Sequence, residues 1–571
     1  MDSLRIAAAT SLFLSCAVHA FPPPTAPRAG ELLREKKYPE SIAEYEAYLK
    51  TNRFDGSAWS NYAYAQHMGG DLEGSIKSGL RALELGFRPE TESYNIACAY
   101  ALLGKTDEAL IWLEKAFDHR YADQQTLEGD DDLNSLRADP RFIALTGLKP
   151  PEEPDAAKRW AWDFDFLARR MKQMHWDLYA NIPKDKFLAE IDALKSAAAS
   201  GLREDRLRAR LSKLLASVGD GHTTLAAYAD GEKSLHRIPL HLWTFPDGVY
   251  VIGAPETNKE LVGAKLTKIG AMKADDASLA LRQFCSVDNE MGYLYAIPAR
   301  MVQPAALQEI GATGATVGSD IEYTFRFADG TEKPVKLAPV AMPRDGFGKS
   351  RLFRKGYIYA NADAKAPTPL YQQDPEKPLT LKYLDDQRAV YFGFQAVSGN
   401  EGESFKHVIE SMNSLIEEKS PDYLIIDMRL NGGGNTGLVA PFIESVIRNA
   451  KLNQPGKLFV IIGRNTFSAA QNTVNMLEKF TNATFVGEPT GSRPAFVGES
   501  TYVLLPYSKL RVHCSSRYWQ VLDSTDHRTW VQPQIAAEMT FNDFAENRDP
   551  SMEAITRAID SGRASQKAQG K

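Results

Sequence analysis

The sequence predicts a multidomain α+β protein, and three observations indicate this fold class. The chain has 571 residues, which is more than a single hydrophobic core usually organises. Its apolar residues recur with helical spacing as far as about residue 215 and then form short strand-like runs. From about residue 379, strand patterns and helix patterns alternate, which predicts a layered α/β core.

Composition and charge narrow the class of protein further. Hydrophobic residues make up 43% of the chain and charged residues 25%, as in ordinary folded proteins, so a packed core is expected throughout. The formal net charge is only −6 and no Lys/Arg block stands out. Nucleic acid is therefore not expected as a partner.

The cysteines predict neither a disulfide framework nor a metal site. Apart from Cys16, the chain contains Cys98, Cys285 and Cys514, which are odd in number and far apart in the sequence. We expect three isolated thiols, mostly buried. A single disulfide among them is the alternative.

Residues 1–20 are predicted to be a signal peptide. An apolar run at residues 6–18 is too short to span a bilayer and ends in small residues at Val18 and Ala20. A plain apolar N-terminus and a lipidation site at Cys16 are the alternatives. Since no other stretch has the roughly 18 apolar residues of a transmembrane helix, we expect a soluble periplasmic or extracellular protein without a transmembrane segment.

A repeat of 34 residues occupies the first quarter of the chain. Two sets of apolar residues keep this spacing: Ile42, Ile76 and Leu110, and Leu49, Leu83 and Phe117. This period is typical of tetratricopeptide repeats, so helical repeats are expected over residues 28–148, with Gly104 separating a helix at 94–103 from one at 106–117. Stacked repeats present a concave face, which either binds a peptide or protein partner or serves as a spacer.

Three further segments follow a proline-rich stretch at residues 149–154. Residues 157–228 read as a second helical segment, residues 235–345 as a small mixed β domain, and residues 379–560 as the α/β core. The strands expected in the core are Val390–Phe394, Tyr423–Met428, Leu458–Ile462 and Thr484–Val486, with Thr501–Leu505 and Leu510–Cys514 completing it. The helices expected between the core strands are Ser404–Glu417, Leu438–Asn449 and Ser468–Phe480.

Ser468 stands where the strand at 458–462 passes through a polar turn into a helix. The first backbone N–H groups of a helix and its positive dipole end stabilise negative charge. The small residues Ala469 and Ala470 leave room for a substrate. These features suit a nucleophile, while the alternative is that Ser468 only caps the helix.

A run of three glycines follows the buried strand at 423–428. Glycine adopts positive φ without strain, so the turn Asn431-Gly432-Gly433-Gly434 can present backbone N–H groups to an anion. An oxyanion hole needs donors of this kind. The turn lacks the lysine of a phosphate-binding loop, which disfavours nucleotide binding.

His222 lies in a third short motif, Gly219-Asp220-Gly221-His222-Thr223. Histidine is the usual general base near neutral pH, and small neighbours give it access to a reacting group. The alternative is an ordinary solvated loop histidine.

Together these motifs resemble the tail-specific, or C-terminal-processing, serine peptidases, and most of all the branch similar to the tricorn protease core. Four segments match in the family's order, namely Gly219–Thr223, Asp427–Gly434, Thr466–Ala470 and Val486–Gly491. The resemblance covers about residues 160–560. It implies a ClpP/crotonase-like core at 379–560, a helical cap at 157–228 carrying the histidine, and a PDZ-like β domain at 235–345 without a clean carboxylate-binding loop.

The resemblance also implies roles for particular residues. Many members use a lysine about 25 residues after the serine, but Arg493 stands there and arginine cannot serve as a base. The tricorn-like branch uses a histidine, which maps onto His222, and an acidic residue before a late proline, for which Asp526 is the nearest match. Asp526 would orient the imidazole, or else be an ordinary surface carboxylate. Asp220 would shape its turn.

The chain is therefore expected to be a serine-type endopeptidase acting on a peptide or protein substrate. Ser468 would be the nucleophile, and backbone N–H groups at Gly433 and Ala469 would form the oxyanion hole. Arg493 would bind a substrate carboxylate or form a structural salt bridge, and Asp427 would brace the glycine turn through Arg429. No metal or organic cofactor is implied. The alternatives are an inactive peptide-binding or protein-binding scaffold, and an esterase or amidase with the same residues.

Overall fold

The computed structural model describes residues 27–121, 123–148, 152, 155–228, 234–314, 318–343 and 352–569. The expected signal peptide and Cys16 lie outside these residues. The chain divides into two compact units. Unit 1 holds the residues up to 178 together with 191–201 and 500–516, and unit 2 holds 179–190, 202–499 and the residues from 517 onward.

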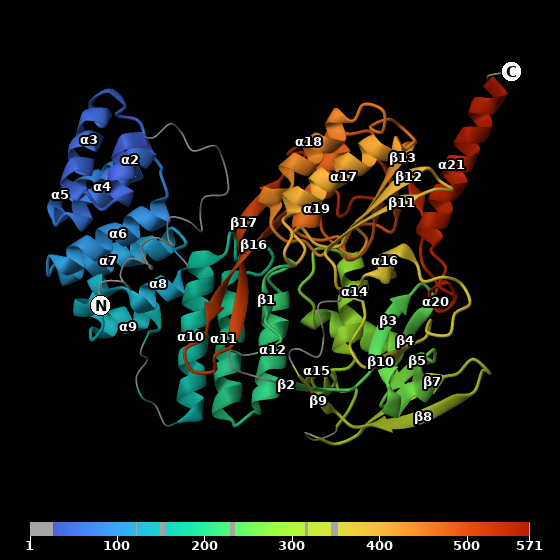
Figure 1. Ribbon diagram of the computed structural model, residues 1–571. Coiled ribbons are helices and arrows are strands. Elements are labelled where there is room, and N and C mark those ends of the chain that lie inside the picture. The colour runs from blue at the N-terminus through green and yellow to red at the C-terminus, as the bar shows by residue number, and fades with distance from the viewer. Residues whose placement is uncertain are drawn as a thin grey trace. The chain divides into compact units, whose positions relative to one another are not determined.

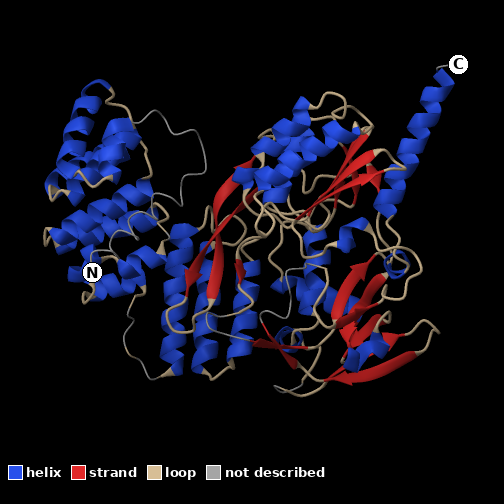
Figure 2. Ribbon diagram, in the orientation of Figure 1, coloured by secondary structure: helices blue, strands red, loops and turns tan. Residues whose placement is uncertain are grey.

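Unit 1 is mainly helical (Figure 2). Its helices are α2 (Pro27–Arg34), α3 (Tyr38–Thr51), α4 (Gly56–Met68), α5 (Leu72–Glu84), α6 (Pro89–Leu102), α7 (Thr106–Asp118), α8 (Gln124–Gly129), the 3₁₀ helix η1 (Asp131–Leu136), α9 (Pro140–Thr146) and α10 (Ala156–Met174). Helices α4 and α5 pack together, as do α6 and α7. Gly104 has φ +71° between α6 and α7, so the helix pair expected around this residue is confirmed.

The first part of unit 2 contains α12 (Glu204–Ala216), β1 (Thr224–Leu225) and an antiparallel sheet, while α11 (Lys184–Ala199) has residues in both units. The strands that follow are β2 (Ser234–Arg237), β3 (His241–Phe245), β4 (Gly248–Pro255), β5 (Lys265–Ile269), β6 (Met272–Lys273), β7 (Ile321–Arg326), β8 (Glu332–Leu337), β9 (Val340–Pro343) and β10 (Tyr357–Tyr359). Seven of them form a sheet of order β10-β4-β5-β7-β8, with β3 also on β4 and β6 on β5. Strands β2 and β9 pair separately.

Helices between these strands bury the apolar face of the sheet. They are η2 (Glu256–Leu261), α13 (Ala274–Leu281), η3 (Arg282–Phe284), α14 (Glu290–Arg300) and α15 (Pro304–Glu309). Ile321, Tyr323 and Phe325 alternate along β7 with exposed or half-buried residues and join one core with Leu281 and Ile297. This period of two is what the sequence pattern predicts for a strand with one buried face.

The second part of unit 2 is an α/β layer. A six-stranded sheet has the order β11-β12-β13-β14-β15-β18, in which β11 is antiparallel and the other strands are parallel. Its strands are β11 (Leu379–Leu384), β12 (Ala389–Phe394), β13 (Tyr423–Asp427), β14 (Leu458–Ile462), β15 (Thr484–Gly487) and β18 (Ile535–Ala536). The helices are α16 (Leu370–Gln373), α17 (Phe405–Lys419), η5 (Thr436–Leu438), α18 (Ala440–Arg448), α19 (Ala469–Phe480), α20 (Phe541–Ala545) and α21 (Pro550–Gln569). The expected core strands 390–394, 423–428, 458–462 and 484–486 and the three helices between them are confirmed.

Both faces of this sheet are covered. Figure 1 shows α17, α18 and α19 on one side of the sheet and α21 on the other. Phe392 and Ile426 point into the core with the first three helices, whereas Tyr391 and Ile425 point into the core with α21. Burial on both faces explains why these strands are almost continuously apolar.

The expected strands at 501–505 and 510–514 are present but do not belong to the six-stranded sheet, so that part of the prediction is wrong. They lie in β16 (Ala495–Leu504) and β17 (Arg511–Gln520), which belong to a separate three-stranded sheet. The edge position beside β15 is taken by β18, which pairs with it in parallel. A short strand near the end of the chain therefore completes the core instead.

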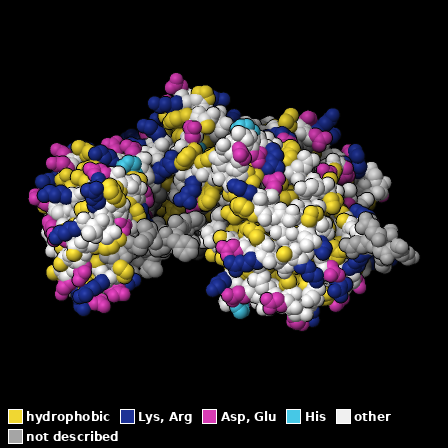
Figure 3. Space-filling model, turned by 90° about the horizontal axis from the view of Figure 1, so that it is seen from above, with side chains coloured by type: hydrophobic (Ala, Val, Ile, Leu, Met, Phe, Trp, Pro, Cys, Tyr) yellow, Lys and Arg dark blue, Asp and Glu magenta, His cyan; other side chains and the backbone are white. Residues whose placement is uncertain are grey.

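The cysteines form no disulfide among the described residues. Cys98, Cys285 and Cys514 are all buried thiols, as predicted. Within the described parts of the chain, no helix combines the length and the apolar character needed to cross a bilayer. The face in Figure 3 carries Lys and Arg interspersed with Asp and Glu, in keeping with the small net charge.

A buried ion cluster fixes the end of β13. Arg429 Nε donates to Asp427 Oδ1 at 3.0 Å, and its two terminal nitrogens donate to the two carboxylate oxygens of Asp549 at 2.8 and 3.0 Å. Tyr391 Oη donates to Asp427 Oδ2 at 2.9 Å. The side chains of Arg429 and Asp427 are only 10% and 3% exposed. The predicted link from Asp427 through Arg429 is therefore present, and it ties β13 to the residue before α21.

Arg429→Ala should strongly destabilise unit 2. It leaves two carboxylates buried without their cation, which typically costs about 3–5 kcal/mol. Urea denaturation followed by intrinsic fluorescence measures the loss. Arg448→Ala on α18, where the side chain is 80% exposed, is the control and should change stability by about 0.5 kcal/mol or less. Equal stability of the two variants would contradict this account of the cluster.

Candidate active site

Ser468 occupies a strained turn between β14 and α19. Its backbone has φ +59° and ψ −123°, a conformation that residues other than glycine rarely adopt. The turn is held by side chains that reach the end of β13: Thr466 Oγ1 donates to the Met428 carbonyl at 2.9 Å, and Asn465 Nδ2 to the Leu430 carbonyl at 2.8 Å. The Ser468 side chain makes no capping hydrogen bond, so the alternative in which it only caps α19 is wrong.

His222 lies next to Ser468, although 246 residues separate them in the sequence. The distance from His222 Nε2 to Ser468 Oγ is 2.8 Å. Asp220 Oδ1 accepts the backbone N–H groups of His222 at 2.9 Å and Thr223 at 2.7 Å, so Asp220 shapes the histidine turn as expected. The structure thus brings together the two residues on which the predicted chemistry depends.

Two phenylalanines hold the imidazole ring. It stacks on Phe467, with ring centroids 4.4 Å apart, and on Phe496, with ring centroids 5.6 Å apart. Burial lowers the pKa of His222 below its usual value, and the Asp288 and Asp220 carboxylates and the Val497 carbonyl offset part of this effect. A lowered pKa keeps the imidazole neutral at pH 7, the form that can accept a proton. Nδ1 is buried and, among the described residues, no group makes a hydrogen bond of normal geometry with it, although the Val497 carbonyl is close enough to affect the pKa of the ring.

Gly433 approaches the serine more closely than any other residue type could. With φ +105°, a Cβ at this position would lie 2.8 Å from Ser468 Cβ and 3.0 Å from the Phe467 carbonyl oxygen. The Gly433 N–H donates to Asn431 Oδ1 at 3.0 Å, so this amide is not the free oxyanion donor that we expected. The N–H of Ala469 lies in the first turn of α19, where no acceptor inside the helix exists.

Gly433→Ala should reduce kcat/KM for peptide hydrolysis by about 10²-fold, because an added methyl group displaces the nucleophile and small displacements of reacting groups have costs of this size. Steady-state kinetics on a fluorogenic peptide provide the measurement. Gly562→Ala in α21, where a Cβ would meet nothing within 4 Å, should retain wild-type activity. Wild-type activity in Gly433→Ala would mean that the close approach has no catalytic role.

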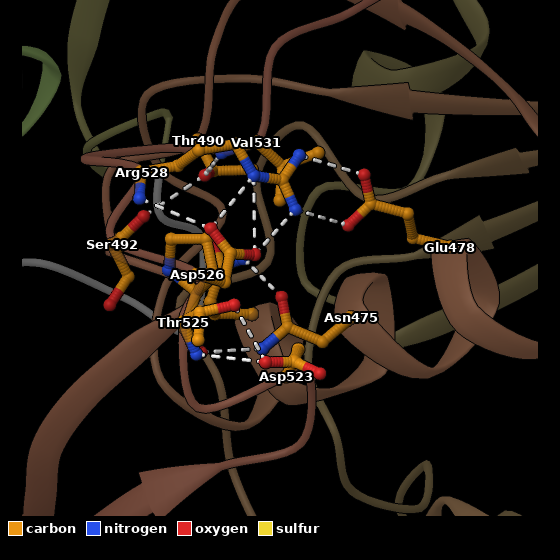
Figure 4. A network of polar contacts seen from close by, with 11 residues as sticks. Asn475, Glu478, Thr490, Ser492, Asp523, Thr525, Asp526, Arg528 and Val531 are labelled. Atoms are coloured by element: carbon orange, nitrogen blue, oxygen red, sulfur yellow. Dashed lines mark hydrogen bonds and ion pairs between the residues drawn. The ribbon is translucent and has the colours of Figure 1, made fainter.

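Asp526 does not serve His222 in this structure, and the expectation that it orients the imidazole needs correction. Arg528 donates to Asp526 from Nε at 3.0 Å and from a terminal nitrogen at 2.7 Å, and it also binds Glu478 (Figure 4). These contacts lower the pKa of Asp526. A guanidinium two residues away therefore engages the carboxylate, and no contact between Asp526 and His222 is present among the described residues.

Asp288 is the carboxylate that the sequence analysis missed. Its side chain is buried, accepts the Gly221 N–H at 2.7 Å through Oδ1 and accepts the Ser492 hydroxyl through Oδ2. Among the charged groups that favour protonated His222, Asp288 has the largest effect on its pKa. Asp288 lies between two helices and its spacing from the histidine motif follows no recognisable pattern, so the sequence contains no signal for it.

Asp288→Asn should shift the acid limb of the pH profile of kcat/KM to lower pH. The carboxylate raises the pKa of His222, so its removal lowers that pKa further. If His222 acts as a base, the variant should also reduce the rate near neutral pH, because protonated His222 loses a counter-charge. A purely structural role would lower the rate without moving the limb. Asp526→Asn is the matched control and should leave the limb in place.

Arg493 contacts the segment that carries Asp288. Its Nε donates to the Asp288 backbone carbonyl at 2.8 Å, and the residue is exposed. This contact supports a loop on the histidine side of the site. The contact is to a carbonyl group and not to a carboxylate, so it is not the salt bridge considered from the sequence.

One group of side chains in unit 1 has the donor types of a metal site. Single ligand atoms of Cys98, Asp130 and Asp132 lie within 4.8 Å of one another. Asp130 Oδ2 already accepts the Tyr94 hydroxyl at 2.7 Å and the Cys98 thiol at 3.6 Å, and its Oδ1 accepts the N–H of Asp132. These hydrogen bonds account for the cluster as the N-terminal cap of η1.

Comparison with known proteins gives weak likenesses. No family model matches the chain, and no curated protein matches it. Among solved structures, CPAF complexed with lactacystin is 12% identical over 71% of this chain and 98% of that chain, with a TM-score of 0.49. The photosystem II D1 C-terminal processing protease is 14% identical over 70% and 96%, with a TM-score of 0.34. The tricorn protease is 12% identical over 71% and 37%, with a TM-score of 0.31.

The last two structures are named for the kinds of peptidase that the sequence motifs resemble. At these identities and TM-scores, the likeness assigns neither an activity nor residue roles to this chain. The chemistry available at the site depends on Ser468, His222 and their neighbours.

Proposed function

We propose that this chain is a serine peptidase that hydrolyses peptide bonds through an acyl-enzyme on Ser468, with His222 as general base. The observation that carries the proposal is the 2.8 Å distance between His222 Nε2 and Ser468 Oγ. It is supported by the positive φ of Ser468 at the start of α19, since a strained turn from strand to helix is a recurrent way to expose a nucleophilic serine.

In the first half of the reaction, His222 Nε2 accepts the proton of Ser468 Oγ as the oxygen attacks the carbonyl carbon of a peptide bond. The N–H of Ala469 donates to the oxyanion, helped by the positive end of α19. We assign Gly433 to the same hole as the residue whose lack of a side chain leaves space beside Ser468. The imidazolium then protonates the leaving amine, and an ester on Ser468 remains.

In the second half, His222 takes a proton from a water molecule, and the hydroxide attacks the ester carbonyl. Collapse of the second tetrahedral intermediate releases the carboxylic acid product and returns the proton to Ser468 Oγ. Asp288 lies behind Gly221 and stabilises the imidazolium at both stages through its charge. Arg493 holds the Asp288 segment and remains our proposed contact for a substrate carboxylate.

The purified chain should react covalently with a fluorophosphonate probe, as detected by gel fluorescence and by mass spectrometry of the labelled peptide. Ser468→Ala should abolish labelling, and His222→Ala should slow it by about 10²- to 10⁴-fold, the usual contribution of a general base. Ser561→Ala, an exposed serine in α21, is the matched control and should label like the wild type.

Absence of labelling in the wild type would contradict the proposal and favour an inactive binding protein. Digestion of a mixed peptide library, with the products identified by mass spectrometry, then tests the substrate class. Hydrolysis of esters without cleavage of any peptide would favour an esterase instead.

The remaining assignments follow from the same proposal. The antiparallel sheet at 235–345 is assigned as PDZ-like, and the six-stranded layer as ClpP/crotonase-like, supported by its parallel strands with intervening helices on one face. The helical repeats at 28–148, which include the packed pairs α4 with α5 and α6 with α7, are assigned as tetratricopeptide-like and as a surface for a protein partner. With residues 1–20 as a signal peptide, the site of action is the periplasm or the extracellular space.

A further inference from the structure

We propose that unit 2 contains a second binding site, apart from Ser468, for a small organic anion that carries two or more negative charges. The site is a cavity of about 770 Å³, which is within the range of about 300–1,000 Å³ found for small-molecule sites. Residues of α12, β2, β3, α14 and α15 line it. None of the three catalytic motifs contributes to its described lining.

The lining of this arginine cavity has an excess of positive charge. Five guanidinium groups line it, from Arg203, Arg208, Arg237, Arg300 and Arg354. The described lining contains two carboxylates, Glu204 and Asp205. Because arginine stays protonated in proteins, the cavity keeps this excess at every physiological pH.

The two carboxylates lie at the start of α12 beside two of the arginines. Arg203 binds Asp205 at 2.7 Å, and Arg208 lies 3.9 Å from Glu204. The other three arginines come from different elements: Arg237 ends β2, Arg300 ends α14, and Arg354 follows in the chain segment before β10. The fold therefore converges three cations on one cavity from separate parts of unit 2.

The guanidinium groups are close enough to repel one another. Burial lowers the pKa of Arg237 to about 10, and Arg300, Arg354 and Arg208 lower it as well, while Tyr228 acts in the opposite direction. Like charges gathered in a partly desolvated cavity raise the free energy of the folded chain. A bound anion reverses that repulsion, and guanidinium groups bind phosphate and carboxylate oxygens in a bidentate manner.

Backbone contacts position part of this set of cations before any ligand arrives. Arg354 donates to the Leu240 carbonyl at 3.0 Å, and Arg208 donates to the Ala227 carbonyl at 2.7 Å. Side chains that are already ordered lose less conformational entropy when a ligand binds. This distinguishes the arginine cavity from a surface on which arginines gather by chance.

The rest of the lining suits an organic body attached to the charged groups. Trp243 and Tyr295 form an edge-to-face pair with ring centroids 6.2 Å apart, and Leu242 and Pro298 also line the cavity. A mostly apolar wall with a few convergent charged groups is typical of small-molecule sites. Phosphate esters and polycarboxylates share the required chemistry, so we test one probe of each kind.

Isothermal titration calorimetry of the full chain carrying Ser468→Ala, with sodium pyrophosphate and with sodium citrate at constant ionic strength, tests the proposal. We expect saturable binding of at least one probe. Arg237→Gln and Arg300→Gln should each weaken it about tenfold or more, as loss of a charged hydrogen bond does. Arg300→Lys, which keeps the charge, should weaken it less than Arg300→Gln. Arg326→Gln on β7, in an exposed pair with Glu332, is the control and should bind like the parent.

Binding of pyrophosphate alone would identify phosphate as the recognised group, and binding of citrate alone would identify carboxylates. Failure of both probes to bind saturably would overturn the proposal, as would equal binding by Arg237→Gln, Arg300→Gln and the parent. Thermal unfolding with and without the bound probe gives a second readout. The probe should raise the unfolding temperature of the parent and of Arg326→Gln by more than that of Arg237→Gln. Since Ser468 is absent from all these proteins, the result is independent of the proposed peptidase activity.

Discussion

The ion cluster of Arg429 with Asp427 and Asp549 is the constraint on which the rest of the candidate site depends. It holds the carboxyl end of β13, and the glycine turn starts at Asn431, two residues after Arg429. The space beside Gly433 has no room for a methyl group. The glycine turn can therefore approach Ser468 this closely only if the first residues of the turn are held in place. A buried group of charges is costly to assemble, and its place just before the glycine turn explains why a fold would retain it.

The fold was predictable where burial produces a regular pattern of apolar residues in the sequence. Strands buried on both faces, such as Leu458–Ile462, give continuous apolar runs, and the repeats give a fixed period, so the elements themselves were found. Sheet membership was harder because it depends on pairing between distant segments. Two residues of β18, Ile535 and Ala536, are too short a pattern to predict, yet they take the edge position that longer strands were expected to fill.

The same difference between local patterns and distant pairing explains which site residues could be predicted. Ser468, His222 and the glycine turn stand in local motifs whose residue types suit their chemistry, so local sequence was enough to nominate them. Local sequence was not enough to identify the carboxylate near His222, because that role depends on where a side chain lies in the folded structure. Asp526 matched a family spacing, but the neighbouring Arg528 engages it, whereas Asp288 reaches the histidine motif from a segment with no motif of its own. Two other features also depend on the folded structure and could not be predicted from the sequence. One is the stacking of His222 on Phe496, and the other is the convergence of arginines on one cavity.

The long sequence separation between His222 and Ser468 has a consequence for how this protein is made. A ribosome that has synthesised the histidine turn must still add the whole antiparallel sheet and most of the α/β layer before the serine exists. Until both segments have folded against each other, the nascent chain holds the histidine turn without its serine partner. The candidate site can therefore form only late in biosynthesis, after both segments have been made and folded.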